Sequence, residues 1–145
     1  AIYALAKNPG SVKGKKSLIT PNPFEFYVLT GREIYQLSDG EKVPIVQEEA
    51  FKLQTTILLK GRNDIISDGK EVAINKTGGP YLAKGGTGDS MAGIAGAFLA
   101  RGIEPFLAAQ AAAYINGLAG ETVAKRIGES LTAMDLIETI PEVIR

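Results

Sequence analysis

The chain has 145 residues, 45% of them hydrophobic and 22% charged, and its 16 basic and 16 acidic residues give a formal net charge of zero. This length fits one domain with a sizeable core, and the balanced charge provides no overall field that would draw the chain to nucleic acid or an anionic membrane. The lack of cysteine and histidine excludes thiol nucleophiles, disulfides, histidine bases and conventional zinc sites. With no signal-peptide pattern and no apolar run of membrane length, we expect a cytoplasmic protein.

The first twenty residues predict a helix, a polar turn and a strand. Residues 1 to 6 form an apolar helix that starts without methionine or a capping residue, so we expect the sequence to be a fragment. The basic run from Lys13 to Lys16 is short and predicts a solvated turn. Residues 17 to 20 predict a strand that ends at Pro21, which suits entry into a binding loop at the carboxyl edge of a sheet.

A capped helix follows in the stretch TPNPFEFYVLTG. Asn22 is a good N-cap, Pro23 suits the first helical turn, and Gly31 ends the helix. Two interpretations stay open for the polar residues at its start. Asn22 is either a plain cap or a site residue, and Glu25 either faces the site or simply favours the helix N-terminus.

A structural helix and a buried strand are predicted next. Asp39-Gly40 is predicted to form a turn. Residues 43 to 54 then have the periodicity of an amphipathic helix with an outward charged face. Residues 56 to 60 are a continuous apolar run closed by a lysine and a glycine. Such a run is typical of a strand buried on both faces of a parallel sheet.

A hairpin is predicted after this strand. Residues 64 to 67 and 71 to 75 are two short strands joined by an aspartate–glycine pair, which is a strong hairpin signal. The segment between the buried strand and the hairpin has the composition of a polyphosphate contact. Lys60 or Arg62 would supply positive charge there, and Gly61 would let the backbone approach closely.

The chain is organised around the stretch KGGTGDSMAGIAGAFLARG. A loop of almost no side-chain bulk, Gly85 to Gly88, is followed by Asp89 and by a helix whose buried face is predicted to carry Met91, Ile94, Ala95, Phe98 and Leu99. A helix that opens from a glycine loop directs unpaired N–H groups and its positive dipole end outward, which predicts an anion site. The simpler alternative is a turn in which Asp89 or Thr87 caps the helix. The pattern is neither the dinucleotide fingerprint nor a P-loop.

Two helices complete the chain. Pro105 opens a long helix to about Arg126 that is rich in alanine and glycine, a composition that allows close packing. Thr132 and Asp135 form a capping box for the last helix. Strand, helix, strand, hairpin and helices in this order indicate an α/β layered domain, parallel in its core, whose candidate loops gather at one edge of the sheet.

Three motifs carry a resemblance to a known family. The GTGD signature resembles that of the ribokinase-like superfamily, and GGTGD-x-x-AG is most similar to the NAD(P)H-hydrate dehydratases. TPN-x-x-EF and KG-x-x-D resemble two further blocks of the same family, and Asn116-Gly-Leu-Ala-Gly120 resembles its HG-x-AG segment near the adenine. The chain departs from the family's usual residues at Phe24, Gly79 and Asn116, and many members have histidine where this chain has Asn22. The resemblance implies a three-layer α/β/α domain with a mostly parallel central sheet and a small hairpin, of which residues 1 to 145 are the C-terminal portion.

The resemblance also implies roles for individual residues. Asp89 would be the catalytic base toward the attacking hydroxyl. The nucleotide would contact two segments, which comprise Lys60, Gly61, Arg62, Asn63, Asp64, Gly85, Gly86, Thr87 and Gly88. Asn22 and Glu25, together with Asp89, would bind the hydrated nicotinamide. No residue is expected to form a metal site of its own.

The implied reaction is repair of a damaged cofactor. ADP or ATP with Mg²⁺ would phosphorylate the hydroxyl of hydrated NADH or NADPH, and loss of phosphate would restore the nicotinamide. A glycine loop, one carboxylate, one cation and Mg²⁺ suffice for such a transfer. The partners expected are the hydrate, the nucleotide, the N-terminal half of the domain and further copies of the chain. Two alternatives stay open: a small-molecule kinase of the same superfamily, and a non-catalytic nucleotide-binding fragment.

Overall fold

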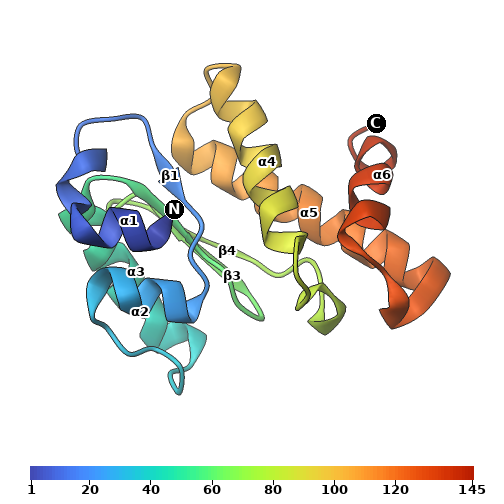
Figure 1. Ribbon diagram of the computed structural model, residues 1–145, viewed down its shortest axis with the longest axis horizontal. Coiled ribbons are helices and arrows are strands. Elements are labelled where there is room, and N and C mark those ends of the chain that lie inside the picture. The colour runs from blue at the N-terminus through green and yellow to red at the C-terminus, as the bar shows by residue number, and fades with distance from the viewer.

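The computed structural model describes the whole chain, residues 1 to 145, as six helices and four strands (Figure 1). The elements are, in order, α1 (Ile2–Lys7), β1 (Leu18–Ile19), α2 (Pro23–Thr30), α3 (Asp39–Leu53), β2 (Thr56–Leu59), β3 (Asp64–Ser67), β4 (Val72–Asn75), α4 (Thr87–Ala100), α5 (Pro105–Ile127) and α6 (Ala133–Val143). Short 3-10 turns lie between several of them. Every predicted helix and strand is present.

The four strands form one sheet in the order β1-β2-β3-β4. β1 pairs parallel with β2, whereas the β2–β3 and β3–β4 pairs are antiparallel. We expected a mostly parallel sheet, but in this part of the domain only the β1–β2 pair is parallel. The connections explain the difference, because residues 60 to 63 and the Asp68-Gly69 turn are far too short for the crossover that parallel neighbours require.

Helices cover both faces of the sheet, so the layering is α/β/α (Figure 1). On one face, Ile57 and Leu59 of β2 pack against Phe26, Val46 and residues around them from α2 and α3. On the other face, Leu58 of β2 packs against α4 and an alanine-lined side of α5. Successive side chains of a strand point to opposite faces, which is why the uninterrupted apolar run of β2 supplies both cores.

The start of α3 differs from the prediction. The helix begins at Asp39 and not at Val43, and the Asp39-Gly40 pair forms its first residues and not a turn. The cause is a capping box in which Ser38 Oγ accepts from the Glu41 amide while Glu41 Oε2 accepts from the Ser38 amide at 2.8 Å. Local capping thus overrides the turn preference of an aspartate–glycine pair.

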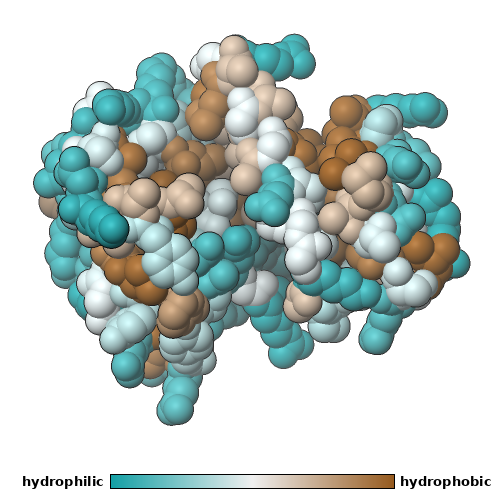
Figure 2. All heavy atoms as spheres, viewed as in Figure 1, coloured by the Kyte–Doolittle hydropathy of each residue, from teal (hydrophilic) through white to brown (hydrophobic).

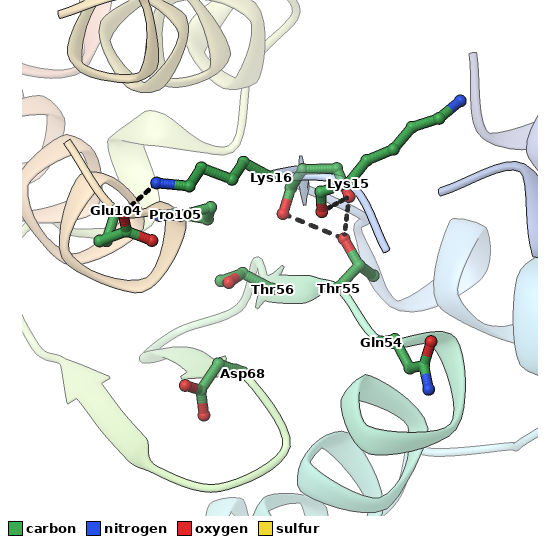
Figure 3. A pocket seen from close by; sticks show the side chains of 9 residues that line it. Lys15, Lys16, Gln54, Thr55, Thr56, Asp68, Glu104 and Pro105 are labelled. Atoms are coloured by element: carbon green, nitrogen blue, oxygen red, sulfur yellow. Dashed lines mark hydrogen bonds and ion pairs between the residues drawn. The ribbon is translucent and has the colours of Figure 1, made fainter. Parts of the chain in front are cut away.

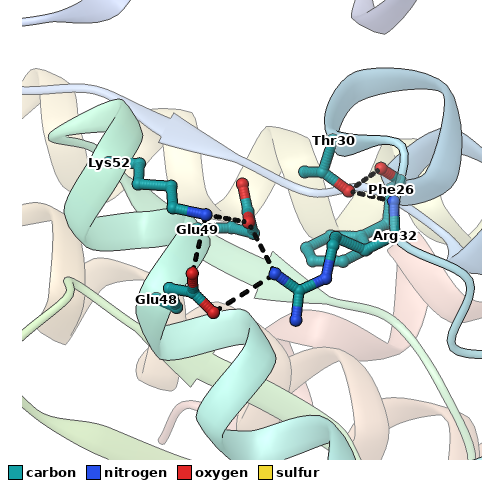
Figure 4. A network of polar contacts seen from close by, with 6 residues as sticks. All are labelled: Phe26, Thr30, Arg32, Glu48, Glu49 and Lys52. Atoms are coloured by element: carbon teal, nitrogen blue, oxygen red, sulfur yellow. Dashed lines mark hydrogen bonds and ion pairs between the residues drawn. The ribbon is translucent and has the colours of Figure 1, made fainter.

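A four-residue polar network ties the segment after α2 to α3 (Figure 4). Arg32 Nη1 lies 3.2 Å from Glu48 Oε2 and 3.4 Å from Glu49 Oε1, and Lys52 Nζ lies 2.7 and 2.9 Å from the same two residues. Hydrogen bonds from Lys52 and then Arg32 lower the pKa of Glu48. Glu49 is buried, and both cations reach it, so its charge is compensated. The network holds the segment that follows α2 against α3.

The surface is mixed in polarity. Polar residues cover much of the face drawn in Figure 2, and hydrophobic side chains gather in the notch where α4 and α6 stand apart above α5. None of the helices combines the length and apolar character needed to cross a bilayer.

Candidate functional site

The ends of β1 and β2 bring the first two predicted site segments together. The Lys60 amide, just after β2, donates to the Pro21 carbonyl, just after β1, at 2.9 Å. This bond places the first turn of α2 beside the carboxyl end of β2. The Lys60 ammonium then reaches Glu25, with 3.6 Å between Nζ and Oε2. Parallel strands therefore bring these loops to one edge of the sheet, as the sequence predicted.

The same lysine reaches the third segment, at the start of α4. A Cβ placed on Gly88 would lie 3.0 Å from Lys60 Nζ and 3.6 Å from its Cδ, so the lysine side chain runs along the first turn of the helix. The structure thus brings together Glu25, Lys60 and Gly88 from three elements. One ammonium stands between a carboxylate and a helix N-terminus.

The glycine loop leaves four amides without an acceptor in the protein. The N–H groups of Gly85, Gly86, Gly88 and Asp89 donate no hydrogen bond to any protein atom, whereas the Thr87 amide bonds Lys84 O at 3.4 Å. Gly86 is the N-cap residue, with φ of 91°, a left-handed conformation that favours glycine. We call these four unpaired amides the amide cradle. It combines free donors with the positive end of the α4 dipole.

Asp89 lies beside the amide cradle, in the first turn of α4, and is exposed. Its carboxylate makes no hydrogen bond or ion pair with the protein. The alternative in which Asp89 or Thr87 caps the helix is wrong, because α4 has no side-chain cap. Thr87 instead donates from Oγ1 to the carbonyls of Leu82 at 2.6 Å and Lys84 at 2.9 Å, which fastens the preceding loop.

The segment that follows β2 is shaped by its own polar side chains. Asp64 is 8% exposed; its Oδ1 accepts from the Gly61 amide at 3.2 Å and its Oδ2 from Asn75 Nδ2 at 3.1 Å. Burial raises the pKa of the Asp64 carboxyl, and these two hydrogen bonds oppose the rise. Asn63 Nδ2 donates to Asp39 Oδ2 at 2.7 Å. Arg62 is exposed and makes no ion pair.

Comparison with known proteins identifies the family of the chain. Residues 1 to 142 match the profile of the family described as NAD(P)H-hydrate dehydratase. The chain belongs to that family. It is 50% identical over 126 residues to a bifunctional NAD(P)H-hydrate repair enzyme Nnr from Pyrobaculum aerophilum, covering 87% of this chain and 25% of that protein. It is 44% identical over 136 residues to an ADP-dependent (S)-NAD(P)H-hydrate dehydratase from Cenarchaeum symbiosum, covering 94% of this chain and 47% of that protein.

A solved dehydratase has the same fold. The chain resembles the crystal structure of the ADP/ATP-dependent NAD(P)H-hydrate dehydratase from Bacillus subtilis that was co-crystallized with ATP/Mg²⁺ and soaked with CoA. The TM-score is 0.79 at 33% sequence identity, over 87% of this chain and 47% of the other. The ribokinase-like α/β/α fold is therefore confirmed. The chain spans a quarter to about half of the length of these relatives.

The substrate residues predicted for this dehydratase-family chain are both engaged in a cap. Asn22 Oδ1 accepts from the Glu25 amide at 2.9 Å, and Glu25 Oε2 accepts from the Asn22 amide at 2.7 Å. The interpretation of Asn22 as a cap is thus confirmed. Its role toward a hydrated nicotinamide stays a prediction, as does that of Glu25, which lies between the cap and Lys60.

The predicted nucleotide residues divide into two kinds. Gly61 and Arg62 are exposed at the edge of the sheet, whereas Asn63 and Asp64 use their side chains to hold the segment in place. Contact of these residues, or of the glycine loop, with a nucleotide stays a prediction. The geometry adds that the Asp64 carboxylate accepts from the Gly61 amide and from Asn75.

Two supporting residues, Asn75 and Glu121, were not predicted as part of the site, and a third, Asn116, was linked to it only through the family's segment near the adenine. Asn75 holds Asp64 and also accepts from Thr77 Oγ1 at 2.9 Å. Glu121 Oε1 accepts from the Gly78 amide at 2.8 Å. Asn116 is buried beneath the first turn of α4. Their role as supports is visible only in the folded structure. Gly117, next to Asn116, packs closely against Thr77, because a Cβ there would lie 2.1 Å from Thr77 Oγ1.

Two hollows lie elsewhere on this dehydratase-family chain. One, of about 190 Å³, is lined only by polar residues and proline, among them Lys16, Thr56 and Glu104, near the starts of β1 and β2 (Figure 3). Lys16 pairs there with Glu104, so the predicted solvated turn carries an exposed ion pair. The other, of about 360 Å³, is mostly apolar and lies between β4 and α5. Neither is lined by Asp89, Lys60 or the amide cradle.

Proposed function

We propose that the complete protein containing this chain dehydrates hydrated NADH or NADPH at the expense of ADP or ATP. In this proposal the chain carries the phosphoryl-transfer half of the site. The observation that supports it most is the amide cradle beside the free carboxylate of Asp89 and the Lys60 ammonium. Membership of the dehydratase family supplies the substrate class.

Asp89 is proposed as the base. It accepts the proton of the hydrate hydroxyl as that oxygen attacks the terminal phosphorus of the nucleotide, and the bond from phosphorus to the bridging oxygen breaks. The resulting phosphate ester then loses inorganic phosphate and a ring proton, which restores the reduced nicotinamide. A carboxylate with no protein partner is available for this work, because it has no competing hydrogen bond to give up.

The amide cradle and Lys60 are proposed to stabilise the transferring phosphoryl group. Charge on this group is spread over its equatorial oxygens, and fixed N–H donors directed at such oxygens require no reorganisation during the reaction. The cradle contains the amides of Gly85, Gly86 and Gly88, and Lys60 adds a positive charge next to Gly88. Arg62 and Gly61 contact the rest of the nucleotide in this proposal, while Asn63, Asp64 and Thr87 hold the two loops in shape.

The donor set fits a magnesium ion that arrives with the nucleotide. No three acidic, histidine or cysteine residues lie close enough together to hold a metal by themselves. Mg²⁺ is commonly bound through one or two carboxylates together with substrate phosphates, and Glu25, 3.6 Å from Lys60, is the carboxylate proposed for this part, which leaves Asp89 free to act as the base. When bound, the ion would neutralise phosphate charge.

The acceptor is proposed to lie on the α2 side of the cradle. Asn22 and Glu25 form the N-terminus of that helix, and Glu25 contacts Lys60, so a hydrated nicotinamide there would face Asp89 across the lysine. We further propose that the protein acts in the cytoplasm, as a homo-oligomer, with the remaining part of its domain completing the site. Nucleic acid and membranes are not among the proposed partners.

The Asp89→Asn variant of the complete protein tests the proposed function. Absorbance in the reduced-nicotinamide band is followed with hydrated NADH, nucleotide and Mg²⁺. We expect turnover to be abolished while nucleotide affinity stays within about threefold, because the amide still occupies the position of the carboxylate but cannot take a proton. Full activity of this variant would contradict the assignment of Asp89.

The fate of the phosphate separates the dehydratase from a kinase of the same fold. With hydrated NADH as acceptor, we expect inorganic phosphate to be released in proportion to the reduced nicotinamide formed. Phosphate retained on a small-molecule acceptor would indicate a kinase. A complete protein that binds nucleotide but releases neither product would indicate a binding module.

A further inference from the structure

A buried polar cluster lies directly beneath the amide cradle. Asn116 of α5 is 1% exposed and Ser90 of α4 is 8% exposed. Asn116 Nδ2 donates to the Thr87 carbonyl at 3.3 Å, and Ser90 Oγ lies 2.7 Å from the same carbonyl oxygen and 2.8 Å from Asn116 Oδ1. The cluster joins two helices that are separated in sequence and meets the backbone at the first residue of α4.

The geometry of one peptide group links this cluster to the cradle. The Thr87 carbonyl and the Gly88 N–H belong to the same planar trans peptide, so they point in opposite directions. A donor that holds the carbonyl from the α5 side therefore fixes the direction of the Gly88 N–H on the other side. That N–H is one of the four without an acceptor in the protein, and it lies next to Lys60.

An amide side chain satisfies both partners in the cluster. Ser90 has one hydroxyl proton for two acceptors, the Thr87 carbonyl and Asn116 Oδ1. Asn116 supplies an N–H to the carbonyl and an oxygen to Ser90 at the same time. An aspartate of the same shape would turn a carboxylate oxygen toward the carbonyl, which repels it, and an alanine would leave the carbonyl to the Ser90 hydroxyl alone.

We propose that Asn116 is a positioning residue for phosphoryl transfer: it fixes the Thr87–Gly88 peptide and so directs the Gly88 amide at the transferring group. This inference rests on the proposed function. In this inference α5, which contributes no amide to the cradle, orients the cradle through Asn116. Preorganised donors are effective only when they are held in the required direction before the reaction begins.

The test compares Asn116→Asp and Asn116→Ala with the parent in the complete protein. We measure kcat and the KM for hydrated NADH at saturating nucleotide, corrected for the folded fraction from circular dichroism. We expect kcat to fall about 10- to 100-fold, since displacement of a catalytic donor by a fraction of an ångström has effects of this size. The KM for the hydrate is expected to stay within about twofold, because the hydrate is bound by other residues.

Val123→Ala is the matched control. Val123 is buried in the same helix and takes no part in the cluster, so its truncation lowers stability and leaves kcat of the folded protein unchanged. If both Asn116 variants fail to fold, Ser90→Ala removes one donor from the Thr87 carbonyl and is expected to lower kcat by a smaller factor. Folded Asn116 variants, or a Ser90→Ala variant in their place, with kcat within twofold of the parent would overturn the inference. A parent without dehydration activity would instead overturn the proposed function.

Discussion

The N-termini of α2 and α4 are built in opposite ways at the same edge of the sheet. In α2, Asn22 and Glu25 form a complete capping box that satisfies two amides. In α4, the N-cap is Gly86, no side chain caps the helix, and four amides of the loop and first turn remain free. Free amides reduce the stability of a helix end, and retaining them makes sense where an external anion completes the bonds.

The other helices sharpen this contrast. α3 and α6 begin with capping boxes made by Ser38 with Glu41 and by Thr132 with Asp135. α5 also lacks a side-chain cap, but Pro105 has no N–H to satisfy and the adjacent Glu104 brings its own negative charge. At α5 the nearby cation, Lys16, is paired with the N-cap residue Glu104, whereas at α4 the Lys60 ammonium lies beside Gly88 and the free amides. The comparison teaches that a missing cap, which α1 and α5 share, marks the candidate site only where free amides, a free carboxylate and a cation lie together.

Adding a side chain at Gly86, the N-cap residue of α4, should have the largest effect on turnover. Gly86→Ala puts a Cβ on a residue with φ of 91°, 2.8 Å from Ala133 Cβ, so the loop must change its path. We expect turnover to fall by at least about 100-fold and the free energy of unfolding to drop by about 1 to 2 kcal/mol. Steady-state assays and urea titrations of the complete protein measure these two effects.

Gly85→Ala is the matched control for this variant. A Cβ at Gly85 meets no atom within 4 Å, its φ is not in the left-handed region, and alanine keeps the backbone N–H. We expect turnover within about threefold of the parent, since the cradle keeps all its donors. Equal losses in the two variants would show that the loop tolerates no side chain at all and that the amide geometry at Gly86 is not special.

Removing caps should have a smaller effect that depends on the helix. Asn22→Ala and Thr132→Ala each break a capping box and should lower the free energy of unfolding by about 1 kcal/mol. Only Asn22→Ala frees Glu25 next to Lys60, so we expect it alone to raise the KM for hydrated NADH, by several-fold. Unchanged KM in both variants would make Asn22 a cap and nothing more.

The smallest effect concerns the pH dependence of stability. Burial raises the pKa of Asp64 above its ordinary value of 3.8, so the folded state holds this proton more tightly than the unfolded state. Stability from this group is therefore full below about pH 4 and declines as pH rises toward the raised pKa. We expect the decline in urea-unfolding free energy between pH 4 and pH 7 to be smaller in Asp64→Asn than in the parent. A steeper decline in the variant would reverse the sign of the argument.

Local patterns predicted most of the fold. Apolar periodicity, capping residues and the aspartate–glycine turn of the hairpin are short-range signals, and each element that they predicted is present. The start of α3 was missed because Asp39-Gly40 favours a turn in isolation, and only the Ser38 and Glu41 cap reverses that preference. The strand directions were missed in part because helices cover both faces of β2, so this strand is apolar throughout although its pair with β3 is antiparallel.

The loops of the candidate site could be predicted from the sequence, but the buried residues that hold these loops in place could not. Gly85 to Asp89 and Lys60 lie in segments whose chemistry is visible in the sequence. Asn116 could not be given its place, because its bonds reach Ser90 and Thr87 across 26 and 29 residues and depend on how α5 packs against α4. The bond of Asp64 to Asn75 could not be predicted for the same reason, because it is known only once the hairpin is folded.

The most direct test of the account is to follow backbone amides by nuclear magnetic resonance as Mg²⁺ and a non-hydrolysable ATP analogue are added to the complete protein. We predict large shifts for the amides of Gly85, Gly86 and Gly88 and none for the amides of Glu48 and its neighbours in the middle of α3, which packs on the opposite face of the sheet. Saturating nucleotide that leaves these three glycine amides unshifted would contradict the claim that the uncapped start of α4 holds the phosphate.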